Sequence, residues 1–126
     1  MGDPEMDELV ERLVANVGIS STAAEQSIGI ILDFLKKEGP PEKVQALLEQ
    51  LPGSEIFLQA AEAAGDPGGM FMSGIMGAGT RMMSAGLSMD QVQSVTRETI
   101  AFVREKAGED AVGEIVGAIP GLAQFI

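Results

Sequence analysis

Apolar residues recur with helical spacing over most of this 126-residue chain, and no stretch alternates polar and apolar residues with period two. One such stretch covers residues 6–17, and longer ones cover about 21–37 and about 89–106. Two shorter stretches show the i, i+3, i+4, i+7 spacing most clearly: Val44, Leu47, Leu48 and Leu51, and Val112, Ile115, Val116 and Ile119. The pattern predicts an all-α fold.

Turn residues separate these predicted helices. Gly18 can adopt the backbone conformation that ends a helix, and Ser20 can cap the helix that follows. Ser88 and Gln91 have the spacing of a capping box. A Pro-Gly pair, at 52–53 and again at 120–121, ends each of the two shorter helices, and an Ala-rich helix is expected after the first pair.

A 41-residue unit occurs twice in the chain, because residues 18–58 align without a gap on residues 86–126. The identical pairs are Gly18/Gly86, Ser20/Ser88, Phe34/Phe102, Val44/Val112, Pro52/Pro120, Gly53/Gly121 and Phe57/Phe125. We therefore predict a single all-α domain, 1–126, made of two pseudo-symmetric helical repeats within 6–64 and 70–126. Its core should include Phe34, Phe102, Leu32, Ile100, Leu48 and Val116.

The composition restricts the chemistry that the chain can perform. It contains no His, Cys, Trp or Tyr, so the usual general base, thiolate ligands and a Ser–His–Asp triad are all absent. The acidic clusters near the start and at 109–114 lack the spacing of an EF-hand and are expected to be solvated. We predict that the chain is not an enzyme and that it uses no cofactor or bound metal.

The net charge of −11 affects the choice of partner. Such a charge repels nucleic acid and anionic lipid surfaces, whereas it suits a basic protein or divalent cations. The acidic start, MGDPEMDELVERL, lacks the basic and apolar regions of a signal peptide, and no apolar run is long enough to span a membrane. We therefore expect a cytoplasmic protein.

The segment between the repeats has an unusual composition. Residues 65–86 contain seven glycines and five of the eight methionines. This segment can be a connecting helix, a lining for a lipid-like ligand, or an interface between copies of the chain, because methionine side chains fill irregular gaps and adapt to binding partners. The candidate ligand or interface residues are Met70, Phe71, Met72, Gly74, Met76, Ala78, Met82 and Met83.

The order of the turns supports a family resemblance. A Gly-Ile/Leu-Ser turn, two helices and a Leu/Ile-Pro-Gly stop occur at 18–53 and again at 86–121. This arrangement resembles the VcgC/VcgE-like bacterial domain of unknown function, or a sister family of duplicated helical repeats, over roughly residues 6–126. The resemblance implies a helical fold and brings no activity with it.

Two functional hypotheses remain from the sequence. The first is a protein-interaction module, as a homodimer or other oligomer, with the small residues of the Met/Gly-rich segment allowing close helix packing. The second is a carrier or sensor of a small apolar ligand, bound at the Met-rich segment.

Overall fold

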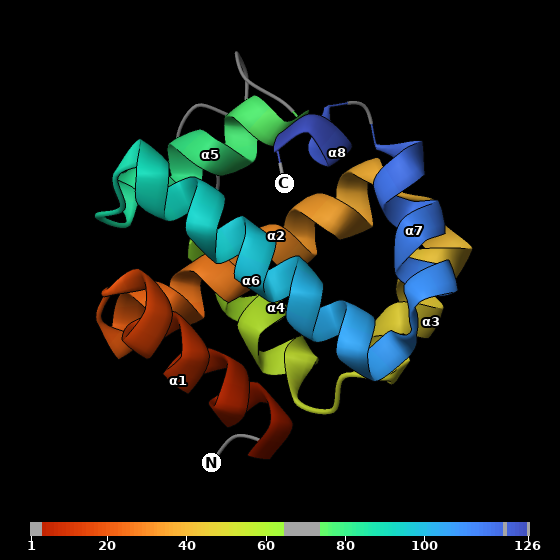
Figure 1. Cartoon of the computed structure of the whole chain (residues 1–126), viewed down its shortest axis with the longest axis horizontal. Helices are drawn as coiled ribbons and strands as arrows, with labels where there is room; N and C mark the ends of the chain where they lie inside the picture. The colour runs from red at the N-terminus through yellow and green to blue at the C-terminus, as the bar shows by residue number, and fades with distance from the viewer. Residues whose placement is uncertain (1–3, 65–73, 120, 126) are drawn as a thin grey trace.

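The computed structural model describes residues 4–64, 74–119 and 121–125, and these residues form helices joined by short turns, without a strand among them (Figure 1). The fold is therefore all-α, as the sequence predicts. The helices are α1 (Pro4–Val17), α2 (Ser21–Glu38), α3 (Pro41–Glu49), α4 (Ser54–Ala64), α5 (Gly74–Ser84), α6 (Met89–Ala107), α7 (Glu109–Ala118) and the short α8 (Leu122–Phe125).

Local capping chemistry sets the helix boundaries. The Ser20 hydroxyl accepts a hydrogen bond from the Ala23 N–H, at 3.1 Å. Ser88 and Gln91 form the predicted capping box, in which each residue's backbone N–H donates to the other's side chain. Gly18 and Gly86 precede these caps with φ angles of 82° and 108°, a region that L-residues with a side chain rarely adopt.

Helix α2 lies at the centre of the molecule and contacts α1, α3, α4, α5 and α6 (Figure 1). The reason is its composition, because every residue from Ser27 to Leu35 is buried and most of them are apolar. A helix that is apolar on all sides needs cover on all sides. Helix α6, by contrast, keeps a polar outer face that includes Arg97, Arg104 and Glu105.

Helix α4 packs closely along α2, and Gly29 makes this approach possible. A Cβ atom at Gly29 would collide with the carbonyl oxygen of Phe57 and would lie 3.1 Å from the Cβ of Ala61. The second copy of the repeat has Arg97 at the position equivalent to Gly29, and Arg97 is exposed. The close α2–α4 contact therefore belongs to the first copy alone among the described residues.

The helix boundaries follow the internal repeat. Helices α2 and α6 begin at 21 and 89, and α3 and α7 begin at 41 and 109, which is a shift of 68 residues in both cases. The contacts also cross between the copies, because α1 packs on α6, α5 packs on α2, and α3 packs on α7. The spatial symmetry of the two repeats stays a prediction.

Most of the predicted core residues lie in the core. Phe34, Phe102, Leu32, Ile100 and Val116 are buried. Leu48 is only half-buried and packs against the margin of the core, which corrects its prediction as a core residue. The ring of Phe102 is fully buried, and the charged ends of Arg12 and Lys106 lie 5.7 and 5.4 Å from its centroid. Phe102 thus joins α1 to α6.

The Met/Gly-rich segment is helical from Gly74 onwards, as α5. Ala78 and Met82 face inwards and pack between α2 and α6. Ala78 therefore serves packing within this chain. In the described part of the chain, no helix has the length and apolar character needed to cross a membrane.

Candidate functional site

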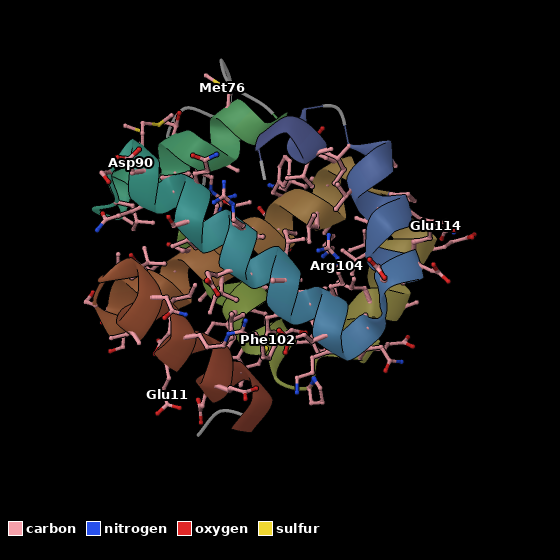
Figure 2. The ribbon with its side chains drawn as sticks, viewed as in Figure 1. Glu11, Met76, Asp90, Phe102, Arg104 and Glu114 are labelled. Carbon is pink, nitrogen blue, oxygen red and sulfur yellow. The ribbon has the colours of Figure 1, made fainter. Side chains whose placement is uncertain are left out.

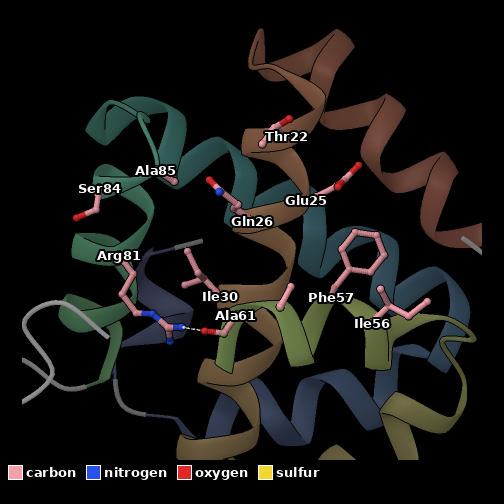
Figure 3. A pocket seen from close by; sticks show the side chains of 11 residues that line it. Thr22, Glu25, Gln26, Ile30, Ile56, Phe57, Ala61, Arg81, Ser84 and Ala85 are labelled. Atoms are coloured by element: carbon pink, nitrogen blue, oxygen red, sulfur yellow. Dashed lines mark hydrogen bonds between the residues drawn. The ribbon is translucent and has the colours of Figure 1, made fainter. Parts of the chain in front are cut away.

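A groove of about 440 Å³ lies between α2, α4 and α5 (Figure 3). Helix α2 forms its floor, α4 forms one wall, and α5 with the turn that follows it forms the other. The apolar part of the lining comes from Ile30, Ile56, Phe57, Ala60, Ala61 and Ala85. The short side chains of α4 leave this space open, because Ala60 and Ala61 face it where larger residues would fill it.

Arg81 closes one end of the groove. Its side chain is 7% exposed and reaches across from α5 to α4, where one Nη atom donates to the carbonyl oxygen of Ala61 at 3.0 Å (Figure 3). The other Nη atom donates to Oδ2 of Asp33 on α2, at 2.7 Å. Arg81 thus ties together the three helices that form the groove.

Asp33 is the buried counter-charge of Arg81. It is 1% exposed, and its Oδ2 also contacts Nζ of Lys37, at 3.1 Å. Burial by itself raises the pKa of Asp33, but the hydrogen bonds from Arg81 and Lys37 and the charges of these two residues outweigh it and hold the pKa below its ordinary value. Asp33 is therefore ionised at neutral pH.

One polar atom of this cluster lacks a hydrogen bond to the rest of the described chain. The second carboxylate oxygen of Asp33, Oδ1, is buried and has no hydrogen-bond partner within the described ranges. The charges of Asp33, Lys37 and Arg81 sum to +1. The buried Arg81–Asp33 pair is itself neutral, and the remaining positive charge is on Lys37, whose side chain is 59% exposed and lies outside the groove lining.

The remaining polar residues of the groove are Thr22, Glu25, Gln26 and Ser84. Ser84 lies one helical turn after Arg81, on the same face of α5. Glu25 lies about two turns before Asp33 on α2, at about 12 Å along the helix axis, so it belongs to the far end of the groove. The groove thus has guanidinium N–H donors at one end and a carboxylate at the other.

The arrangement supplies binding groups and lacks a histidine or cysteine. The groove contains no His or Cys to serve as a base or nucleophile, because the chain has neither. Among the residues that the structure places, no group of three acids could hold a metal ion. What the lining offers is apolar area, hydroxyl and amide groups, the Glu25 carboxylate and one buried guanidinium.

The predicted site residues fall in several places. Met70, Phe71 and Met72 lie outside the described residues, and Gly74 is the first residue of α5. Ala78 and Met82 are in the core, whereas Met76 and Met83 are 64% and 46% exposed on the outer side of α5, where Figure 2 shows Met76. The groove lining includes none of the predicted residues that are described.

Asp33 and Arg81 are not among the residues predicted from the sequence, although each is an isolated charge in an otherwise uncharged stretch. Asp33 interrupts the apolar run IGIILDFL, and Arg81 is the only charged residue of the Met-rich helix. A charge inside a helix that is buried on all sides needs a partner of opposite sign. Two such isolated charges in one short chain therefore indicate a pair, even at 48 residues apart in sequence.

Comparison with protein-family models gives no match, and neither the curated proteins nor the solved structures contain one. The resemblance to the VcgC/VcgE-like domain therefore stays a prediction, and we infer the function from the groove and the surface of this chain.

Proposed function

We propose that the chain is a non-catalytic binding protein that holds a small apolar ligand in the groove between α2, α4 and α5. The observation that supports this proposal most is the groove itself. Its volume of about 440 Å³ lies within the range of about 300–1,000 Å³ typical of ligand pockets. Its lining is mainly apolar with a few polar groups at fixed positions, which is also typical of such pockets.

The proposal locates the ligand next to the Met/Gly-rich segment, but not on its methionines. Helix α5 contributes Arg81 and Ser84 to the groove, and Ala85 follows in the turn. The apolar contacts come mainly from α2 and α4. The ligand therefore contacts both copies of the repeat.

The test uses methyl NMR with decanol as a neutral apolar probe. Ile30 and Ile56 line the groove, whereas Met76 and Met83 lie on the outer side of α5. We expect saturable shifts of the two isoleucine methyl signals and unchanged signals from the two methionines. Shifts confined to the methionines, or no saturable shift at all, would contradict the proposal.

A matched pair of α4 variants localises the probe independently. Ala60 lines the groove and Ala63 does not, and both are exposed positions of α4. Ala60→Leu fills the groove and should weaken decanol binding about tenfold, since the probe then competes with a side chain for the same volume. Ala63→Leu should leave binding unchanged. Equal effects of the two substitutions would place the probe elsewhere.

A second candidate function, self-association, is favoured by the exposed methionines. Met76 and Met83 are seven residues apart, on one face of α5, and Met89 at the start of α6 is also exposed. The only charged residue of α5 is the buried Arg81, so this face is an uncharged patch on a strongly acidic chain. Two copies can meet there without bringing their net charges of −11 into direct contact.

Native mass spectrometry and sedimentation at increasing concentration test self-association. A dimer that the double substitution Met76→Glu and Met83→Glu converts to a monomer would support this second function. A monomer at every concentration would rule it out, without affecting the groove.

A further inference from the structure

We propose that the ligand of the groove is an amphiphile with a carboxylate head, and that Arg81 binds this head. The inference rests on the proposed function, and it adds the chemical class of the ligand and its orientation. It follows from three properties of the groove: the free donors of Arg81, the local charge, and the position of Glu25.

Not all N–H groups of the Arg81 guanidinium form hydrogen bonds within the described residues. An arginine side chain carries five N–H donors, and within the described part of the chain Arg81 uses one for Asp33 and one for Ala61. Three donors remain, and the side chain lines the groove. A buried guanidinium is held in place by its two existing bonds, so a ligand that binds it does not have to order a flexible side chain.

The local charge favours a ligand of charge −1 over a more highly charged one. Asp33 neutralises one of the two cations, Arg81 and Lys37, that contact it. Lys37 is 59% exposed and does not line the groove, so its charge attracts an anionic head from a distance, and the direct contact is with the N–H groups of Arg81. A carboxylate brings the cluster of Asp33, Lys37 and Arg81 to neutrality, whereas a doubly charged phosphate makes it negative.

The two ends of the groove fix the orientation of the ligand. Glu25 lies at the end of the groove away from Arg81 (Figure 3), and it repels an anionic head there. Ser84 lines the groove one helical turn after Arg81. The apolar tail then lies over Ile30, Phe57 and Ala60, towards the open part of the groove.

The experiment compares three probes that share a decyl chain and differ in the head: decanoate, decanol and decyltrimethylammonium. Titrations at pH 7.5, which we chose so that the carboxylate is ionised, follow the Ile30 and Ile56 methyl signals. We expect decanoate to bind about tenfold or more tightly than decanol, because charge-assisted hydrogen bonds are stronger than neutral ones, and decyltrimethylammonium to bind most weakly.

A double substitution tests whether Arg81 causes the preference for decanoate over decanol. Asp33→Asn together with Arg81→Gln removes both buried charges and keeps two polar side chains that can hydrogen-bond to each other. In this variant decanoate and decanol should bind with affinities within about twofold of each other. A preference for decanoate that survives in the folded variant would overturn the role of Arg81.

The results for the native chain distinguish the carboxylate assignment from the proposed apolar binding in the groove. Decanol or the ammonium probe binding as tightly as decanoate overturns the carboxylate assignment and leaves the apolar groove in place. No saturable binding of any probe at Ile30 and Ile56 overturns both. The native-chain comparison needs no variant, so a folding defect in the doubly substituted variant does not prevent the test.

Discussion

Asp33 and Arg81 form the one ion pair, among the described residues, in which both side chains are buried. A buried pair gains little over a well-packed apolar pair, because two charges have to leave water. Removal of one partner lowers the stability strongly, since it leaves the other charge buried and unpaired. The pair thus fixes the relative position of α2 and α5 more than it adds to stability.

The lowered pKa of Asp33 makes part of the stability depend on pH. A carboxyl whose pKa is lower in the folded chain than in the unfolded chain stabilises the fold above its unfolded pKa, and this stabilisation is lost as the pH falls through the folded pKa. We predict that urea midpoints fall on acidification below about pH 4, which is the ordinary range of an aspartate. Asp33→Asn should lack this part of the acid dependence.

The same variant should be weaker at neutral pH. Asp33→Asn leaves Arg81 without its counter-charge, and loss of one partner of a buried pair costs about 3–5 kcal/mol. Equal stability of Asp33→Asn and the native chain at pH 7, measured by urea unfolding, would show that water or another group already compensates Arg81.

Gly29 gives a prediction with a matched control. Gly29→Ala places a Cβ against the backbone of Phe57, so α4 has to move away from α2, and we expect a loss of about 1–3 kcal/mol. Gly113 is also inside a helix, but a Cβ there meets nothing within 4 Å. Gly113→Ala should raise the free energy of unfolding by about 0.5–1 kcal/mol through helix propensity alone. A gain at Gly29 in urea unfolding would contradict the close approach of α4.

Helix α6 depends on its N-terminal capping box. Ser88→Ala removes the hydroxyl that accepts from the Gln91 N–H, and we expect a loss of about 1 kcal/mol. Ser94→Ala, inside the same helix, is the control and should have little effect, because alanine favours helix more than serine does. Thermal unfolding by circular dichroism measures both variants. Similar losses for the two would mean that the cap contributes nothing specific.

The ends of the helices could be predicted from the sequence, because they depend on residues close in the chain. Ser20, Ser88 and Gly18 act on their immediate neighbours, and their roles are confirmed. The burial of α2 on all sides also follows from its continuous apolar run. Leu48 shows the limit of this reasoning, because apolar spacing alone does not tell the centre of the core from its margin.

The groove could not be predicted in the same way, because it depends on how distant segments pack. Its shape follows from the close approach of α4 to α2 at Gly29, and from the reach of Arg81 to Ala61. The methionines are predicted as ligand or interface residues because so many of them occur in one segment. Met82 is buried in the core and Met76 faces outwards, so neither lines the groove, although Arg81 and Ser84 of the same helix do.

The crossed contacts between the copies predict that the chain folds as one unit. Helix α1 packs on α6 of the other copy, and α5 packs on α2, so each half alone exposes the apolar surfaces that these contacts cover. We predict that fragments 1–64 and 65–126 are largely unfolded in isolation and gain helix when mixed, as followed by circular dichroism. A cooperative unfolding transition in either fragment alone would show that one copy has a sufficient core of its own.

The methionines of this chain differ in their access to solvent, and this difference has a chemical consequence. Met76, Met83 and Met89 are exposed, whereas Met6 and Met82 are buried. Oxidants convert exposed thioethers to sulfoxides, which turns an apolar side chain into a polar one. Mild peroxide should therefore convert the outer face of α5 into a polar surface while the core stays reduced, and oxidation of Met82 would report that the chain has opened.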